Sequence, residues 1–334
     1  MNILFLIGNG FDLNVGLNTR FKDVLKSYLK ESSEDPRIQK FKKDIDKDFE
    51  NWADFEKQMG VYTENFTVET IDDYCFCMKN FKESLVEHFE KEEKKIDYKV
   101  KEEEIARIFK DSITMFHDKL TNNSRNILYT RTFGMQLSYS FITFNYTNVL
   151  DKCIEISGTN VSRVLHIHGY VLKNPIMGVD NVNQIMNKEL SSNNKINRTI
   201  VKPIINKKLK NLNDTAALNQ IYGSSIICLF GLSLGETDKT WWEAIGKWLV
   251  DHDSRQLVIF NMANEWNPIH PDEEIERNEA VEERFCLLAG LPEQEREYVT
   301  NRIHIGFNTD MFRVNLASPN MDATKAMKMI TEAK

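Results

Sequence analysis

Three short polar sequences could form one ligand site, because each follows an apolar run of the kind that makes a buried strand. They are Ile7-Gly8-Asn9-Gly10-Phe11-Asp12, Phe144-Asn145-Tyr146-Thr147 and His166-Ile167-His168-Gly169. Ligands of open α/β sheets bind beyond the carboxyl ends of the strands. The three sequences are therefore expected to meet in one pocket that combines a glycine turn, an amide and an imidazole. That set of groups indicates a nucleotide-binding site that also contains catalytic groups.

The first glycine turn, Gly8-Asn9-Gly10, suits a phosphate or a ribose. Backbone N–H groups at the start of a helix bind anions, and glycine lets a ligand approach the backbone closely. The turn does not complete the G-x-G-x-x-G fingerprint, because Leu13 stands where the third glycine would be. A tight strand-to-helix turn without a ligand is the alternative. Asp12 either binds a ribose hydroxyl or caps the next helix.

Asn145 and the two histidines are the candidates for chemistry. The Asn145 amide offers a donor and an acceptor without charge, which suits a water or a sugar hydroxyl; an Asx turn is the alternative. His166 and His168 alternate along the expected strand, so they should face the same side. A general acid or base is the favoured role, and two structural histidines the alternative. No metal is expected, because no further ligand lies near them in sequence, while Gly169 leaves room for a ligand.

A second glycine turn, residues 231–238, follows another apolar run. Gly231, Ser233 and Glu236 supply a turn, a hydroxyl and a carboxylate, which suit recognition of a ribose. A capped helix entry is the alternative.

Six apolar runs predict the strands of the sheet that would position these groups. They are Ile3–Ile7, Phe141–Phe144, Arg163–Ile167, Ser225–Phe230, Leu257–Phe260 and Arg302–Ile305. Most connections between them have crossover length. The sequence therefore predicts an α/β fold with a doubly wound, mostly parallel sheet of about six strands.

Residues 31–131 have helical periodicity and many charges, as in the spacing of Phe41, Ile45 and Phe49. We interpret them as a helical insertion after the first strand, which leaves residues 1–30 and 132–334 as an α/β nucleotide-binding domain. The apolar faces of the insertion suggest a homo-oligomer formed through it.

The composition excludes some classes of protein. The 334 residues carry a formal net charge of -7, so no global basic field attracts nucleic acid. Five scattered cysteines argue against a disulfide framework and fit a reducing compartment. No run is long and apolar enough for a leader or a membrane span, so a cytoplasmic protein without a membrane partner is expected.

Together these motifs resemble the bacteriophage abortive-infection AbiH family. The resemblance rests on Gly8–Asp12, Phe144–Thr147, His166–Gly169 and Gly231–Asp238 in this order. The family is in turn similar to the sirtuin-like NAD-binding (Rossmann-type) group. The resemblance implies that Asn145 and His168 form the catalytic pair, that the first glycine turn meets NAD, and that Ser233 contacts a ribose. The other predicted cofactor-binding residues are Phe11, Asp12, Tyr146, His166, Gly169, Gly231 and Glu236.

Sirtuin deacylases carry a zinc module of two cysteine pairs, which this chain lacks. The resemblance therefore favours an antiphage NAD glycohydrolase that cleaves the nicotinamide–ribose bond and depletes NAD. It also implies a phage-derived trigger, for which the helical insertion is the expected binding surface. One alternative is a sensor that binds NAD or ADP-ribose without turnover. A second is a metal-dependent nuclease or phosphoesterase that uses His166 and His168.

Overall fold

The computed structural model describes residues 1–171, 173, 175–262 and 270–316, and its centre is a parallel sheet. The strands are β1 (Asn2–Ile7), β2 (Ser138–Thr143), β3 (Val161–His166), β4 (Ile226–Phe230), β5 (Gln256–Asn261) and β6 (Ile303–Phe307). Every pairing is parallel, and the order is β3-β2-β1-β4-β5-β6. The doubly wound prediction is confirmed, and the strand order reverses between β1 and β4.

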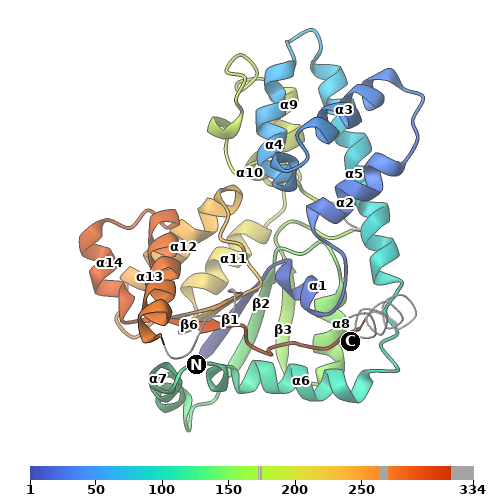
Figure 1. Ribbon diagram of the computed structural model, residues 1–334. Helices are drawn as coiled ribbons and strands as arrows, with labels where there is room; N and C mark the ends of the chain where they lie inside the picture. The colour runs from blue at the N-terminus through green and yellow to red at the C-terminus, as the bar shows by residue number, and fades with distance from the viewer. Residues whose placement is uncertain (172, 174, 263–269, 317–334) are drawn as a thin grey trace.

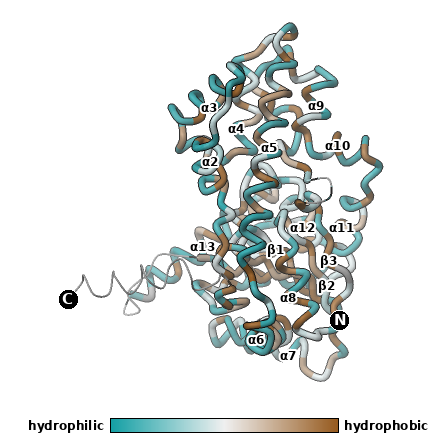
Figure 2. The backbone as a smooth tube through the Cα atoms, turned by 90° about the vertical axis from the view of Figure 1, so that its right-hand side faces the viewer, coloured by the Kyte–Doolittle hydropathy of each residue, from teal (hydrophilic) through white to brown (hydrophobic). Residues whose placement is uncertain are grey.

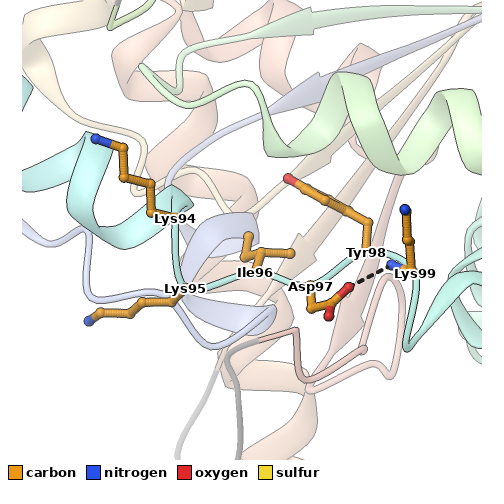
Figure 3. Close-up of a pocket in the computed structure, with 6 residues that line it drawn as sticks. All are labelled: Lys94, Lys95, Ile96, Asp97, Tyr98 and Lys99. Atoms are coloured by element: carbon orange, nitrogen blue, oxygen red, sulfur yellow. Dashed lines mark hydrogen bonds between the residues drawn. The ribbon is translucent and has the colours of Figure 1, made fainter.

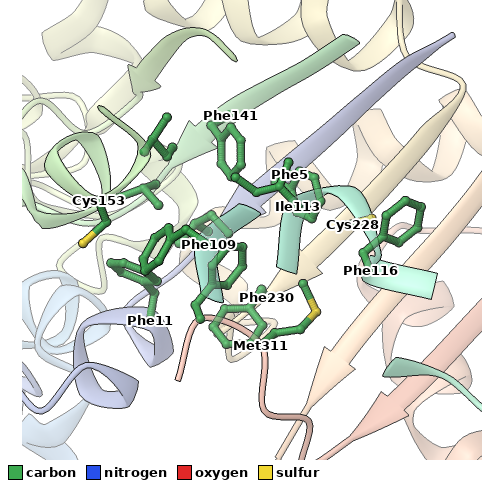
Figure 4. Packing of buried hydrophobic residues seen from close by; sticks show 14 of the residues in the cluster. Phe5, Phe11, Phe109, Ile113, Phe116, Phe141, Cys153, Cys228, Phe230 and Met311 are labelled. Atoms are coloured by element: carbon green, nitrogen blue, oxygen red, sulfur yellow. The ribbon is translucent and has the colours of Figure 1, made fainter. Parts of the chain in front are cut away.

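One face of the sheet is covered by α1 (Gly10–Asn14), α6 (Glu102–Thr114), the 3₁₀ turn η3 (Phe116–Lys119), α7 (Asn122–Thr132) and α8 (Val149–Ser157). Aromatic side chains fill this layer (Figure 4). Phe5 of β1 stacks on Phe141 of β2 with ring centroids 4.9 Å apart, and Phe116 meets Phe5 edge-on at 6.0 Å. Odd-numbered positions of β1 enter this layer, as the period of two along a strand requires.

The opposite face is covered by α11 (Asn213–Tyr222), α12 (Lys239–Val250), α13 (Pro271–Leu288) and α14 (Glu293–Thr300). Trp242 and Trp248 of α12 are buried between these helices and the sheet. Each indole N–H is satisfied, because Trp242 donates to the Gly235 carbonyl at 2.8 Å and Trp248 to the Ser224 carbonyl at 2.9 Å. The strands are thus buried on both faces, which explains their continuous apolar runs.

A separate group of helices, here called the helical cluster, lies beyond the carboxyl ends of the strands (Figures 1 and 2). It contains α2 (Phe21–Lys30), α3 (Pro36–Lys47), α4 (Phe55–Tyr62), α5 (Ile71–Glu93), α9 (Asn194–Ile200), α10 (Lys202–Lys208) and the short turns η1 (Asn51–Ala53), η2 (Thr63–Asn65) and η4 (Val182–Gln184). Its core is aromatic, with Phe55 stacked on Phe81 at 3.8 Å.

Residues 31–131 are divided between these two places. The helices α3, α4 and α5 belong to the helical cluster, whereas α6 and α7 pack against the sheet. The cluster also takes in α2 from before this segment and α9 and α10 from after it. The apolar face of α3, with Ile38, Phe41 and Ile45, is buried inside the chain. Among the described residues, no helix has the length and apolar character needed to cross a bilayer.

The two glycine turns pack directly on each other at the carboxyl ends of β1 and β4. The Gly8 N–H donates to the Phe230 carbonyl at 2.9 Å, and the Gly10 N–H donates to the Gly231 carbonyl at 2.8 Å. A Cβ on Gly10 would lie 2.5 Å from the Gly231 Cα, and Gly231 itself has a φ of +68°. Close contact between two backbones therefore requires glycine here, independently of any ligand.

Replacing Gly10 by alanine should destabilise the protein, because the new methyl group would press on backbone atoms that cannot rotate away. We expect Gly10→Ala to lower the free energy of unfolding by about 2 kcal/mol or more. Gly235→Ala is the matched control, since its Cβ would meet nothing closer than 3.7 Å at a φ of -86°. Chemical denaturation measures both, and equal losses would show that the turn contact is unimportant.

Candidate functional site

A cavity of about 1020 Å³ opens where the strand order reverses, between the sheet and the helical cluster. Its wall contains the first glycine turn, the residues after β2, His168 and the second glycine turn. The helical cluster adds Glu56 and Phe89, and the rim carries Arg20, Arg284 and Arg313. The three polar sequences singled out above therefore do contribute to one pocket, as predicted.

Asn145 is held in one orientation from several sides. Its backbone N–H donates to Thr143 Oγ1 at 3.1 Å, and its carbonyl lies 3.3 Å from His166 Nδ1. Its side-chain Nδ2 donates to Asp12 Oδ1 at 3.0 Å. Within the described part of the chain, the remaining atom, Oδ1, is buried without a hydrogen-bond partner. Asn145 lines the cavity, and its buried carbonyl oxygen is free to accept a hydrogen bond if a ligand reaches it.

Asp12 lies beneath this amide and is 1% exposed. The Thr147 hydroxyl contacts both of its oxygens, at 3.0 and 2.8 Å. Burial raises the pKa of Asp12 from 3.8 to about 7, although the hydrogen bonds from Thr147 and Asn145 act in the opposite direction. A carboxyl group that titrates near neutral pH therefore contacts the candidate catalytic amide.

His168 is packed between aromatic rings on one wall. Its ring meets Phe144 edge-on at 5.5 Å and lies 6.2 Å from the Tyr146 ring. Its Nε2 is 3.4 Å from Asp238 Oδ1. This contact restricts the orientation of the ring. With Nε2–H directed at the carboxylate, Nδ1 would be the proton acceptor.

Asp238 belongs to a buried ionic cluster formed with Lys202 and Glu56. Lys202 Nζ is 2.8 Å from Asp238 Oδ1 and 3.2 Å from Glu56 Oε2, and its side chain is 5% exposed. Glu56 Oε1 also accepts hydrogen bonds from the Tyr146 hydroxyl and the Gly178 N–H, both at 3.2 Å. The ionic cluster connects the helical cluster to the residues around His168.

The shifts in pKa keep this ionic cluster charged. Burial alone would raise the pKa of Asp238, but Lys202 and His168 hold it well below its usual range. Burial alone would likewise lower the pKa of Lys202, but Asp238 and Glu56 raise it above its usual range. Each ion is therefore stabilised by its partners rather than by solvent.

The predicted site residues separate into two groups. Those that line the cavity are Gly8, Asn9, Gly10, Asp12, Asn145, Tyr146, His168, Gly231 and Ser233. Phe11, His166, Gly169 and Glu236 are not part of its lining. Phe11 is fully buried against Phe109 and Phe312, since it lies on the core side of α1. Glu236 instead forms a surface ion pair with Lys57.

One further expectation needs correction. His166 and His168 do not share a face, because β3 ends at His166 and His168 lies in the turn that follows. His166 instead places Nε2 2.8 Å from Asp151 of α8. Asn9 lines the cavity, and its amide donates to the Thr19 carbonyl at 2.9 Å and accepts from the Thr19 hydroxyl at 2.6 Å. Among the described residues, no group of three or more potential ligands is placed to hold a metal ion.

Several residues of the site were not found from the sequence. Lys202 and Glu56 lie in segments whose charges have no local pattern, and they meet only through the tertiary fold. Arg20, Arg284 and Arg313 come from distant parts of the chain and gather at the rim. Arg284 also donates to the Ser233 and Leu234 carbonyls at 3.3 and 3.1 Å, so it supports the second glycine turn.

A second hollow, of about 490 Å³, lies along residues 94–99 between α5 and α6 (Figure 3). All of its lining residues come from this one connection. Its one drawn hydrogen bond is local, from the Lys99 N–H to Asp97 Oδ1 at 3.1 Å. Groups from different elements do not converge there, so the large cavity is the better candidate site.

The fold and the cavity define a doubly wound α/β protein with a ligand-sized pocket at its topological switch point. Residues 4–260 match the family model described as bacteriophage abortive infection AbiH, and the chain belongs to this family. Membership implies a role in abortive infection by bacteriophage. The match includes all four motifs on which the resemblance rests. The searches found no similar curated protein and no similar solved structure.

The pKa of Asp12 predicts a pH-dependent stability. Between pH 3.8 and about 7 the folded protein holds a proton that the unfolded chain has released, so this group's stabilisation declines as the pH rises. The decline should be on the order of 1 kcal/mol per pH unit across this interval. Asp12→Asn cannot titrate, so the stability difference between parent and variant should shrink from pH 5 to pH 7. Denaturant unfolding measures it, and a constant difference would contradict the assignment.

Replacing Lys202, the buried cation of the ionic cluster, should lower the free energy of unfolding more than replacing a surface lysine. In Lys202→Met, the buried Glu56 and Asp238 lose their shared partner, and we expect a loss of about 3–5 kcal/mol in unfolding free energy. Lys239→Met is the control, since Lys239 forms only an exposed pair with Glu243 at 3.6 Å. Its loss should stay below about 1 kcal/mol. Similar losses for both variants would argue against a structural role for the ionic cluster.

Proposed function

We propose that this protein acts in antiphage defence as an NAD glycohydrolase, which cleaves the bond between nicotinamide and ribose. The observation that carries the proposal is that Asn145, whose buried Oδ1 has no partner among the described residues, lines the same cavity as His168. This cavity lies at the switch point of a doubly wound sheet, where such folds bind nucleotides.

The cavity has the properties needed for a dinucleotide. Its volume of about 1020 Å³ accommodates a ligand of that size, and Arg20, Arg284 and Arg313 supply positive charge at its rim. The N–H groups of Gly8 and Gly10 are already bonded to the β4 turn. We therefore assign phosphate binding to the arginines rather than to these two N–H groups.

The reaction assigned to Asn145 and His168 is hydrolysis of one bond. The bond between C1′ of the ribose and the nicotinamide nitrogen breaks with its electrons going to the ring, which leaves as neutral nicotinamide. Asn145 Oδ1 orients a ribose hydroxyl or the attacking water through a hydrogen bond. His168 accepts the proton of the water whose oxygen bonds to C1′, and ADP-ribose is the second product.

A sensor that binds a nucleotide without turnover is the second candidate. The observation that favours it is the direct connection of the cavity to the helical cluster through Lys202, which pairs with both Asp238 and Glu56. Occupancy of the cavity would then be transmitted to the helices. Tight binding of intact NAD without product would support this function.

The test is to incubate the purified protein with NAD and follow nicotinamide and ADP-ribose by chromatography. We expect Asn145→Ala and His168→Ala each to reduce the rate by about 100-fold or more, because each removes a group that orients or deprotonates the reactants. His252→Ala is the matched control: His252 is exposed, and within the described part of the chain its ring bonds only Ser254.

The outcomes separate the two candidates. Release of nicotinamide that only the two cavity variants abolish would support the glycohydrolase and both residue roles. Unchanged release by His168→Ala would remove the proposed mechanism. Binding of NAD with no release by any form would favour the sensor. Melting temperatures of all variants check that the fold is retained.

A further inference from the structure

The Asn145 amide has two possible orientations, which exchange Oδ1 and Nδ2, and its neighbours decide between them. Its backbone is fixed by Thr143 and His166, so only a rotation of the amide could exchange Oδ1 and Nδ2. Among the residues that the structure describes, Asp12 is the one side chain bonded to that amide. The identity of the group presented to a ligand therefore depends on Asp12.

An ionised Asp12 can only accept hydrogen bonds. Nδ2 of Asn145 must then face Asp12, as observed, and Oδ1 is left without a partner among the described residues. A protonated Asp12 could instead donate to Oδ1, which would turn the NH₂ group to the cavity. The Thr147 hydroxyl can donate or accept, so it tolerates either form of Asp12.

We propose that Asp12 is a positioning residue, which holds the Asn145 amide so that its Oδ1 accepts a hydrogen bond from a hydroxyl of the ribose in the ligand. The inference rests on the proposed function, because it assumes that a ribosyl nucleotide occupies the cavity. It assigns Asp12 a role through Asn145 and not a direct bond to the ligand. It also names the ligand group that the cavity selects, which is a hydroxyl donor.

The surroundings of Asp12 make its charge sensitive to pH. It is buried, with a pKa of about 7, and no cation bonds it in the described structure. The titratable groups that face it are Glu93 of α5, His166 of β3, Tyr98 and Cys153 of α8. Selection of a hydroxyl donor should therefore be strong at alkaline pH and weak at acidic pH.

The experiment is calorimetric binding of ADP-ribose, beside its analogues that lack the 2′- or the 3′-hydroxyl of the terminal ribose, at pH 5.5 and pH 8.5. ADP-ribose has no nicotinamide bond to cleave, so the readout does not depend on turnover. At pH 8.5 the parent should bind ADP-ribose at least about tenfold more tightly than one of the analogues, since that analogue leaves Oδ1 unpaired. At pH 5.5 this ratio should fall toward one.

Asp12→Asn tests the residue itself. The asparagine cannot titrate, so the ratio should be the same at both pH values, whichever way the new amide is turned. Because His166, Glu93, Tyr98 and Cys153 remain, any pH dependence due to them would persist in this variant. Asn145→Ala should show no preference for the hydroxyl at either pH.

Two results would overturn the inference while leaving nucleotide binding intact. One is equal binding of ADP-ribose and both analogues by the parent at pH 8.5. The other is a pH dependence of the ratio that Asp12→Asn retains. A parent that binds neither ADP-ribose nor NAD would overturn the proposed function, and this inference with it.

Discussion

The buried pairing of Lys202 with Glu56 and Asp238 is the constraint on which the arrangement of this molecule depends. The three charges come from α10, α4 and η5 (Glu236–Asp238), so they join the helical cluster to the end of the sheet. Ions removed from water are tolerated only with well-placed partners, and any displacement of the helices would leave one of them unpaired. The same pairing sets the position of Asp238 beside His168. Lys202 therefore both joins the helical cluster to the sheet and holds the carboxylate that contacts His168.

The glycine turns differ in role from the glycines of a dinucleotide-binding fingerprint. The N–H groups of Gly8 and Gly10 bond carbonyl groups of the neighbouring strand end and turn, and the lack of a side chain allows the two backbones to pack closely rather than a phosphate to approach. The proposed function therefore assigns the polar contact with the ligand to Asn145, whose Oδ1 has no partner among the described residues. It assigns the positive charge for an anionic ligand to the arginines that line the cavity.

Local sequence was enough to predict the strands, and through them the meeting of Asn145, Asp12 and His168 in one cavity. Buried parallel strands are short apolar runs that end in turn residues, so their signal does not depend on distant parts of the chain. The alternation rule failed for His166 and His168 because it assumed that the strand continued past His166. The position of Lys202 could not be predicted, since its partners are 146 and 36 residues away.

The long helix α5 has a mechanical consequence. Its first turns lie in the helical cluster, where Tyr74 is fully buried, and its last turns reach the site, where Phe89 stacks on Tyr146 at 5.9 Å. Glu93, at its end, accepts a hydrogen bond from the Asn148 N–H at 2.5 Å. A helix of 23 residues is about 35 Å long. A tilt of about 3° at its outer end would therefore move the cavity wall by about 2 Å, as a lever does.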